Sequence, residues 1–592
     1  MKPGARGSEM AATRRGVILP LVLFTVLLLA LLGAMFSFRV NADLAATQAV
    51  EYRLQTRLAA EAGVELAKVG LRSDRLNMDR WYDNPDEFHR VIVWAYGVDA
   101  SVLGTNEELD EGAMAYRFSL VADDPTDDEK FIRFGITDES AKLNLNEATE
   151  SQLLTLVAAA VGDDEELYPR DIVDAILDWR DSDTEARSEA GDTESEYYRS
   201  LDTPYRVKNA PFDTVEELLL VKGVTPRVLY GEDYDRNGLL TPNERDGDES
   251  FPPDNQDDVL DRGLYPYLTV HTYETNVSND NRARIYLFED EKTLREQLSG
   301  VFEDDPDVVD YIVQATRGAK GPSGAAGSTG SGGQAGDRRR PRRDGSSDSA
   351  GTRDRSSDPK EGARQQRKDD EPDPDENSAG SADTEEAHDE ESEEDADDQG
   401  DEAADAPAQE ESDDADSGSR PIVSPASLLR ERSVGGELVR SPIGLEHLAT
   451  LMDRTTTVEP QQREIRGLVN INTAPVPVLR CFEELTADQI GNIVSARAGL
   501  RGEEKSTTAW LVTEDVLDLD TYETIAPKIT ARGQQFTIEA LGYADHIGTV
   551  SRIQVVVDMV GPIPQPIYYR DLSRLGGHFP IRAEDLETLR GR

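Results

Sequence analysis

An uncharged apolar stretch near the N-terminus constrains this chain more than any other feature. Residues 17–38 read VILPLVLFTVLLLALLGAMFSF and contain no Asp, Glu, Lys or Arg. A helix of that length rises about 33 Å, which is enough to cross a bilayer core of about 30 Å. Arg14 and Arg15 precede it and only Arg39 follows closely, so the positive-inside rule places the N-terminus in the cytoplasm. The stretch predicts a single-pass protein with its bulk outside. A cleaved secretory signal fits less well, because no small-x-small site closes the stretch.

Helical periodicity continues beyond the apolar stretch. Residues 43–70 contain no proline. Apolar side chains recur three or four residues apart at Val50, Leu54, Leu58, Ala62, Leu66 and Val69. This spacing predicts that the membrane helix runs on as an amphipathic helix. A plain juxtamembrane stalk is the alternative.

The composition is strongly acidic and unevenly distributed. The formal net charge is −55, and residues 369–418 hold 25 Asp or Glu without one Lys or Arg. Residues 317–418 contain few large apolar side chains, so we expect a disordered insert. An acidic surface repels phosphate, which argues against binding of nucleic acid. Cys481 is the single cysteine, so no intrachain disulfide can form, and a metal is another means of stabilising an exported chain.

Strand patterns occur at both ends of the part outside the membrane. Residues 115–121 and 130–137 predict a hairpin, and residues 534–542 and 550–557 predict a second strand pair. Helical periodicity predominates between them, at 150–161, 168–179, 215–221, 291–302, 306–314, 426–452, 475–483 and 487–498. We therefore expect one sheet interrupted by a large helical insertion.

The insertion contains an internal repeat. KLNLNEA at 142–148 matches LVNINTA at 468–474, at an offset of 326 residues. Each copy is a short extended segment that leads into a helix, for which Asn146 and Thr473 are candidate N-caps.

A twelve-residue acidic segment carries the strongest site signal. DYDRNGLLTPNE, residues 233–244, fits the EF-hand loop template. Asp233, Asp235 and Asn237 alternate, so that a tight loop directs their oxygens inward, and Gly238 permits the sharp turn. Leu239 would offer its carbonyl, Thr241 would bind directly or through water, and Glu244 would close the shell with two oxygens. The sequence predicts a structural calcium loop, with a chance acidic loop as the alternative.

Two weaker acidic clusters accompany this loop. A possible second metal cluster comprises Asp178, Asp181, Asp183 and Glu196, and residues 254–261 (DNQDDVLD) are a degenerate loop without the glycine. Neighbouring carboxylates are also found in hydrolases. No nucleophile and base accompany them at a recognised spacing, so we do not expect an enzyme.

Several segments resemble the type II secretion protein K family. They are the leader Arg14-Arg15-Gly16 before the apolar run, KLNLNEA (142–148), DWRDSD (178–183), PYRVKNAPF (204–212) and ELLLVKGV (217–224). The leader resembles that of type IV prepilins and pseudopilins, most of which carry Glu at the fifth mature residue. Leu21 stands there in this chain, as in pseudopilin K. The resemblance covers about 14–224 and 467–558.

The resemblance implies a fold, partners and a role. It implies an α+β pseudopilin whose N-terminal transmembrane helix continues into an α/β body with a large inserted helix-hairpin-helix-like domain. It also implies cleavage by prepilin peptidase between Gly16 and Val17, calcium binding, and an inner-membrane protein with its bulk in the periplasm. The chain would lie at the pseudopilus tip beside minor pseudopilins I and J and the major pseudopilin. There it would help to initiate assembly for export of folded proteins, which could also be direct partners.

These expectations divide the chain. The expected parts are a leader (1–16), a transmembrane helix (17–39), its periplasmic extension (40–75), a first sheet part (76–140), the helical insertion (141–316), the disordered insert (317–418), the continued insertion with a second helix-hairpin-helix-like unit (419–532), and a second sheet part with the tail (533–592).

Two other function classes remain open from the sequence. LVKGV at 220–224 resembles the hairpin of helix-hairpin-helix DNA-binding domains. The second glycine is absent and the surroundings are acidic, so we expect a packing role instead of contact with phosphate. An anchored calcium-dependent hydrolase is the remaining alternative.

Overall fold

The structure is a computed structural model. It describes residues 18–109, 114–123, 132–162, 167–187, 194–247, 251–317, 421–434, 437–561, 563–576 and 579. Most of the predicted insert (317–418) and the leader with Gly16 and Val17 lie outside the described residues.

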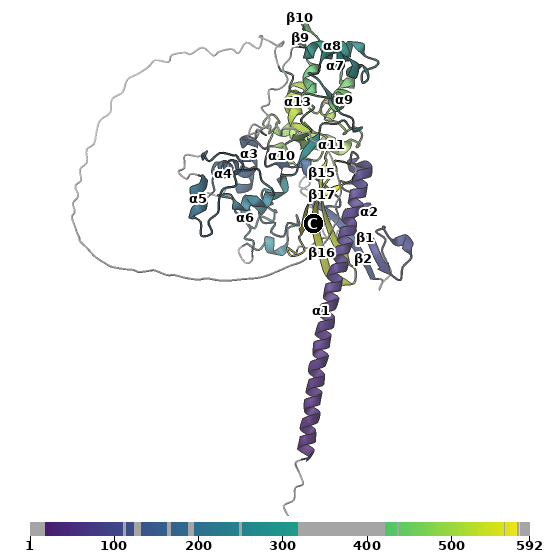
Figure 1. The fold of residues 1–592 in the computed structure, drawn as a ribbon, viewed down its shortest axis with the longest axis vertical. Helices are drawn as coiled ribbons and strands as arrows, with labels where there is room; N and C mark the ends of the chain where they lie inside the picture. The colour runs from purple at the N-terminus through teal and green to yellow at the C-terminus, as the bar shows by residue number, and fades with distance from the viewer. Residues whose placement is uncertain are drawn as a thin grey trace, which may run out of the picture. The chain divides into compact units, whose positions relative to one another are not determined.

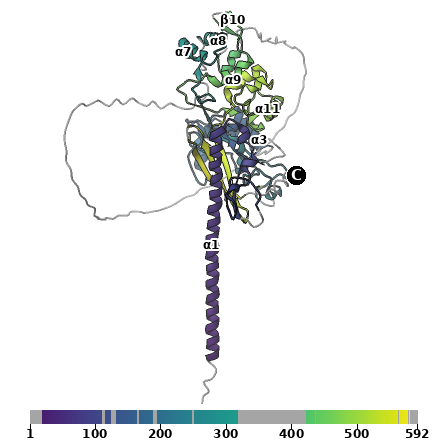
Figure 2. The same cartoon turned by 90° about the vertical axis from the view of Figure 1, so that its right-hand side faces the viewer.

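One helix of 57 residues, α1 (Ile18–Asp74), confirms the predicted continuation of the apolar stretch. Among the described residues it alone is long and apolar enough to cross a membrane, which is consistent with a single anchor. Its first part is exposed over Leu19–Val50, and Figures 1 and 2 show this part extending away from the sheet.

An antiparallel sheet lies against the other end of α1, so the fold is mixed α+β. The strand order is β1-β2-β15-β16-β17, with β3 paired to β2 and β4 to β15. The strands are β1 Val91–Tyr96, β2 Met114–Asp123, β3 Ile132–Arg133, β4 Thr137–Asp138, β15 Gln535–Ala544, β16 Ile547–Asp558 and β17 Gln565–Asp571. The predicted pairing of β15 with β16 is confirmed. The predicted hairpin after β2 is much shorter than expected, because β3 pairs at only two positions and β4 turns to β15.

Small residues bring α1 close to the sheet. Thr56, Ala59, Ala60 and Ala67 are buried in this contact. A Cβ on Gly63 would lie 2.7 Å from the Phe118 ring, and a Cβ on Gly542 would lie 1.8 Å from the Thr56 carbonyl oxygen. Glycine on each element therefore permits the approach.

Several larger aliphatic residues of α1 point away from the sheet, whereas Val64 and Leu71 are buried in the core that α1 shares with it. Val50 is 67% exposed, Leu54 57%, Leu58 53%, Leu66 43% and Val69 66%. The predicted periodicity is present, but the apolar face that it marks does not pack against the sheet of this chain. We call these five residues the aliphatic stripe.

The internal repeat folds into two modules of one design. In the first module (142–269), β5 Leu143–Asn144 pairs in parallel with β6 Leu268–Thr269; in the second (468–530), β13 Val469–Asn470 pairs in parallel with β14 Ile529–Thr530. Each has a hydrophobic core that is made mostly of its own residues. The helices are α3 Glu150–Val161, α4 Pro169–Arg180, α5 Glu194–Ser200 and α6 Pro226–Tyr230 in the first module, and α10 Val476–Leu479, α11 Ala487–Gly499, α12 Trp510–Thr513 and α13 Leu519–Ile525 in the second.

An arginine from a helix stabilises the repeated segment in each module. Arg180 donates to the carbonyls of Leu145 and Ala148, and Arg497 donates to those of Ile471 and Ala474. The carbonyls are equivalent positions of the repeat. The expected cap at Asn146 was wrong, because Thr149 caps α3 and Asn146 exchanges two hydrogen bonds with the Phe212 backbone. The cap expected at Thr473 was also wrong, since α10 begins after Pro475.

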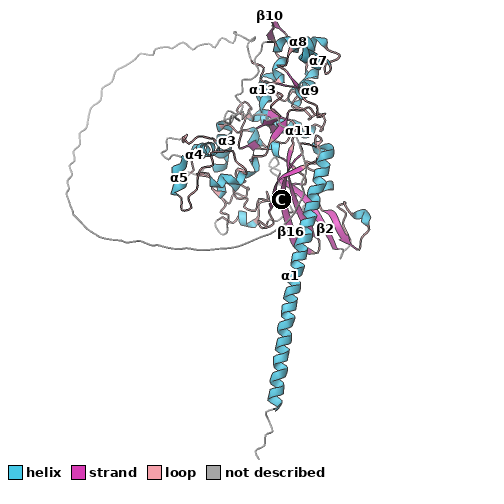
Figure 3. Ribbon diagram, viewed as in Figure 1, coloured by secondary structure: helices cyan, strands magenta, loops and turns pink. Residues whose placement is uncertain are grey.

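A third group of elements lies between the modules in sequence and has a core of its own. It comprises β7 Tyr273–Thr275, β8 Ile285–Tyr286, α7 Glu291–Ser299, α8 Pro306–Thr316, β9 Arg432–Val434, β10 Glu437–Val439, α9 Leu445–Arg454, β11 Thr455–Thr456 and β12 Glu464–Arg466 (Figure 3). The expected helix over 426–452 was wrong. The hairpin β9–β10 interrupts it, and α9 begins only after Gly444. The helix expected at 215–221 is a 3₁₀ turn, Val215–Leu220.

Candidate metal loop

The acidic loop 233–244 follows α6 and ends in the turn Pro242–Glu244. Asp233 follows the close contact of Gly231 with Gly263, where a Cβ on either glycine would collide with backbone atoms. Gly238 has a φ of +70°, so the Asn-Gly pair makes the sharp turn that the template requires. The sequence therefore forms the predicted loop through local turn chemistry.

Backbone amides organise the acidic side chains. Asp233 accepts from the amides of Asn237 and Gly238 at 2.9 and 3.0 Å, and Asp235 accepts from the Asn237 amide at 3.0 Å. The Glu244 carboxylate accepts from the amide and the hydroxyl of Thr241 at 2.9 and 2.6 Å through Oε2. These bonds turn the carboxylates toward the inside of the loop.

Three carboxylates converge there. One oxygen each of Asp233, Asp235 and Glu244 lie within 4.8 Å of one another. Burial, followed by the charges of Asp123, Asp235 and Glu244, raises the pKa of Asp233 to about 8. Glu244 is 1% exposed, and its Oε1 is buried without a hydrogen-bond partner. Converging carboxylates, two of them buried, and an unpartnered oxygen fit a divalent cation, which reverses the local Coulomb energy.

The structure brings together some of the predicted ligands. Asp233, Asp235 and Glu244 converge. Asn237 and Thr241 are buried beside them, but Asn237 Oδ1 accepts from the Leu239 amide at 2.6 Å and the Thr241 hydroxyl donates to Glu244. Leu239 is buried at 8% exposure. All-oxygen ligands at these positions fit a hard cation.

The second predicted cluster is arranged differently. Asp178 and Asp181 both face Arg187, at 3.6 and 3.5 Å, and Asp183 is exposed. Burial, followed by the charge of Asp181, raises the pKa of Asp178 to about 6. The side chain of Glu196 lies outside the described residues. Asp178, Asp181 and Asp183 thus lie near one another, and the side chain of Arg187 already neutralises Asp178 and Asp181.

The degenerate loop 254–261 supports the first loop. Glu232 is 2% exposed, and it accepts from the amides of Asn255 and Asp261 at 3.2 and 3.3 Å. Asp254 accepts from the amides of Gly247 and Gln256. Acidic side chains of residues 254–261 therefore accept hydrogen bonds that fold their own segment, which lies beside loop 233–244.

Sequence reasoning missed the arginines that hold loop 233–244. Arg552 of β16 is 2% exposed and donates to the carbonyls of Asp235 and Arg236. Arg262 donates to the Gly238 carbonyl at 3.3 Å and pairs with Asp123. The one sequence signal of such a contact is a charged residue, Arg552, within the predicted strand 550–557, and this signal does not identify the partner.

Comparison with known proteins gives one family. Residues 136–230 match a family model described as type II secretion system (T2SS), protein K. No curated protein matches the chain. A solved structure, the GspK-GspI-GspJ complex from the enterotoxigenic Escherichia coli type 2 secretion system, aligns over 90% of this chain and 99% of its own. The identity is 8% and the TM-score 0.30, which is too low to establish a shared fold.

The matched region contains the first module as far as α6, including Asp178, Asp181 and the segments 142–148, 204–212 and 217–224. By this match, residues 136–230 are similar to the type II secretion system protein K family.

Proposed function

We propose that this protein is a minor pseudopilin at the tip of a type II secretion pseudopilus, with a structural rather than an enzymatic role. It would lie in the inner membrane through α1, with its N-terminus in the cytoplasm and its bulk in the periplasm. Prepilin peptidase would cleave between Gly16 and Val17. Its partners would be minor pseudopilins I and J and the major pseudopilin, and assembly would serve the export of folded proteins.

The aliphatic stripe of α1 is the observation that carries this proposal. Val50, Leu54, Leu58, Leu66 and Val69 lie beyond the span 17–38, on the side of the helix opposite the small residues that contact the sheet. Apolar residues repeated along one exposed helix face are typical of a surface that packs against another helix. The stripe continues the exposed apolar surface of the membrane span, so one partner helix could follow both.

A substitution on the stripe tests this assembly. We expect Leu54→Asp with Leu58→Asp in the full-length protein to abolish co-purification of minor pseudopilins I and J from detergent-solubilised membranes. Leu438→Asp on β10 is the matched control, because Leu438 is also 57% exposed and lies outside α1. Retention of both partners by the double variant contradicts the proposal.

Calcium is the ion that we propose for loop 233–244, with Asp233, Asp235, Asn237, Leu239, Thr241 and Glu244 as ligands. The converging carboxylates and the unpartnered Glu244 Oε1 support a cation. Flexible loops of oxygen ligands favour calcium over magnesium, which requires a tight octahedron. Calorimetric titration of the full chain with calcium and magnesium tests the choice, and the absence of calcium binding contradicts it.

Two elements of the fold support the pseudopilin body that we propose. A long N-terminal helix lies on an antiparallel sheet made from both ends of the chain, and the two modules lie between those ends in sequence. A nucleic-acid-binding role has less support. Lys222 of the 220–224 segment lies over the Tyr197 ring at 5.1 Å, and a Cβ on Gly223 would lie 2.9 Å from Ile172. That segment is used for packing.

A further inference from the structure

Loop 233–244 is attached to the sheet by an arginine that crosses from β16. Arg552 Nη1 donates to the Asp235 carbonyl at 2.6 Å, and Nη2 donates to the Arg236 carbonyl. Its Nε pairs with Glu539 of β15. The planar guanidinium is therefore fixed on one side by the sheet and on the other by two consecutive loop carbonyls. Asp235, whose carbonyl it binds, also contributes a carboxylate to the acidic cluster.

Two further ionic bridges join the loop to other strands. Glu216 pairs with Arg236 of the loop at 3.3 Å and with Arg570 of β17. Arg262 pairs with Asp123 at the end of β2 and donates to the Gly238 carbonyl. The loop therefore has an arginine-mediated link to each of β16, β17 and β2.

Arg236, which follows Asp235, is held in an uncommon backbone conformation. Arg236 has a φ of +57°, which costs free energy for a residue with a side chain and persists only where neighbours impose it. Its guanidinium lies 5.2 Å from the centres of the Tyr230 and Tyr265 rings. Next to this conformation, the Asp235 carboxylate lies in the cluster and the two carbonyls accept from Arg552.

We propose that Arg552 is a positioning residue that couples cation binding in loop 233–244 to the order of strands β16 and β17. This inference rests on the calcium site proposed above. When an ion binds, the Asp235 carboxylate is drawn to it and the 235–236 peptide is fixed. Arg552 then keeps both of its carbonyl acceptors, and the strand that carries it is stabilised. Without the ion, repulsion among the carboxylates loosens the same peptide and the acceptors with it.

Such coupling is reciprocal, so the arginine must also affect the affinity of the ion. Arg552→Lys retains a charge for Glu539 but cannot reach two carbonyls in the fork geometry of arginine. We expect this variant to bind calcium about fivefold or more weakly than wild type, although no ligand has been changed. We also expect its β16 and β17 amides to respond less to calcium.

Hydrogen exchange and calorimetry on the full-length protein in detergent test the coupling. Exchange is followed by mass spectrometry over residues 547–571 with calcium and with chelator, and calcium affinity is measured in parallel. Arg117→Lys is the matched control. Arg117 of β2 likewise binds two carbonyls, of Arg90 and Glu107, and one carboxylate, Asp545, but none of these belongs to the loop. We expect it to keep wild-type calcium affinity and response.

The outcomes separate the coupling from the site. Slower exchange of 547–571 with calcium in wild type, reduced in Arg552→Lys and retained in Arg117→Lys, supports the proposal. Calcium binding that leaves exchange over 547–571 unchanged overturns the coupling and leaves the site intact. The coupling is also overturned, and the site left intact, if Arg552→Lys keeps the full wild-type change in exchange over 547–571 on calcium binding. Absence of calcium binding overturns both. The wild-type comparison requires no variant, so a variant that fails to fold does not remove the test.

Discussion

The two modules have the same local design but differ in how they join the rest of the molecule. In both, the threonine that ends the parallel strand donates its hydroxyl to a buried glutamate, Thr269 to Glu139 and Thr530 to Glu274. Glu139 is neutralised by Lys142, three residues away at 2.7 Å, which is 17% exposed. Glu274 is neutralised by Arg532 and Arg284. The ion pair of the first joint is local, although Glu139 also accepts from the Thr537 hydroxyl of β15 at 2.6 Å. In the second joint, the ion pair with Arg532 connects segments far apart in sequence.

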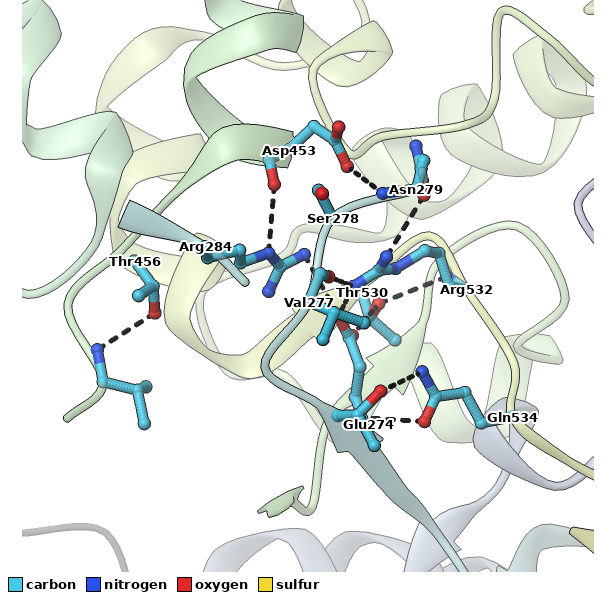
Figure 4. A network of polar contacts seen from close by, with 12 residues as sticks. Glu274, Val277, Ser278, Asn279, Arg284, Asp453, Thr456, Thr530, Arg532 and Gln534 are labelled. Carbon is cyan, nitrogen blue, oxygen red and sulfur yellow. Dashed lines mark hydrogen bonds and ion pairs between the residues drawn. The ribbon is translucent and has the colours of Figure 1, made fainter. Parts of the chain in front are cut away.

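Figure 4 shows how far the second joint extends. Arg532 also donates to the Val277 carbonyl at 2.7 Å and to Asn279 at 3.2 Å, and Arg284 donates to the Asp453 carbonyl at 3.1 Å. The joint thus binds the segment after β7 to the end of α9 and to the residues that lead into β15. The same motif carries one local ion pair and a hydrogen bond to β15 in the first module, and forms an ionic junction of three segments in the second.

Removing the buried glutamate should break the second joint more severely than the first. Glu274→Gln leaves two buried arginines without their anion, and loss of one partner of a buried ion pair costs about 3–5 kcal/mol. Glu139→Gln leaves Lys142, which can be rehydrated, so we expect about 1–3 kcal/mol. Urea unfolding of the full-length protein in detergent measures both changes. Equal losses would contradict the distinction between a local ion pair and a long-range one.

Calcium should stabilise the first module specifically, because loop 233–244 has no counterpart within 468–530 of the second module. At a concentration 100 times its dissociation constant, calcium adds about 2.7 kcal/mol to the free energy of unfolding. We expect a lower melting temperature in chelator, with faster hydrogen exchange around α6. Asp235→Ala with Glu244→Ala should remove the response, and Asp178→Asn with Asp181→Asn should keep it. The reverse pattern would move the ion to the second cluster.

The arginines that hold the repeated segments offer a direct comparison of equivalent positions. Arg180→Lys and Arg497→Lys each lose one of two hydrogen bonds to carbonyls, so we expect a cost of about 1–2 kcal/mol. Arg497 is 8% exposed and Arg180 is less buried, so the loss at Arg497 should be the larger. Thermal unfolding measures it, with Arg199→Lys at an exposed position as the control. A larger loss at Arg180 would show that burial does not govern these contacts.

Acid should weaken the second joint through Glu274. Burial alone would raise its pKa, but Arg532 and Arg284 lower it to about 2, from an ordinary value of 4.5. A carboxyl with a lowered pKa in the folded state stabilises the fold above its unfolded pKa, and this contribution is lost as the pH falls. We expect the free energy of unfolding to fall by about 1 kcal/mol by pH 4 when it is measured in the presence of calcium. We also expect it to depend less on pH below pH 5 in Glu274→Gln. An unchanged pH dependence in that variant would assign the acid sensitivity to other groups.

Short-range patterns allowed several elements to be predicted from the sequence. The apolar run and the periodicity after it determine α1, because helix formation depends on neighbours three and four residues away. Alternation of residue types predicts β15 and β16. The Asn237-Gly238 pair and the alternating oxygens determine loop 233–244, because turn conformation and the direction of its side chains are properties of adjacent residues. The repeat predicts two equivalent segments for the same reason.

Only the tertiary structure decided which faces and charges become partners. Periodicity marks Leu54, Leu58 and Leu66 as one face of α1, yet the opposite face packs on the sheet. At its closest contacts, with Phe118 and Gly542, that face carries only small residues such as Ala60 and Gly63, because larger side chains would collide there. Likewise, no local pattern connects Glu274 with Arg532 or Asp235 with Arg552, which are 258 and 317 residues apart. A buried charge requires an opposite charge or a hydrogen-bond partner, but the sequence does not say which one. That choice follows from which segments the packed sheet and the two modules bring together.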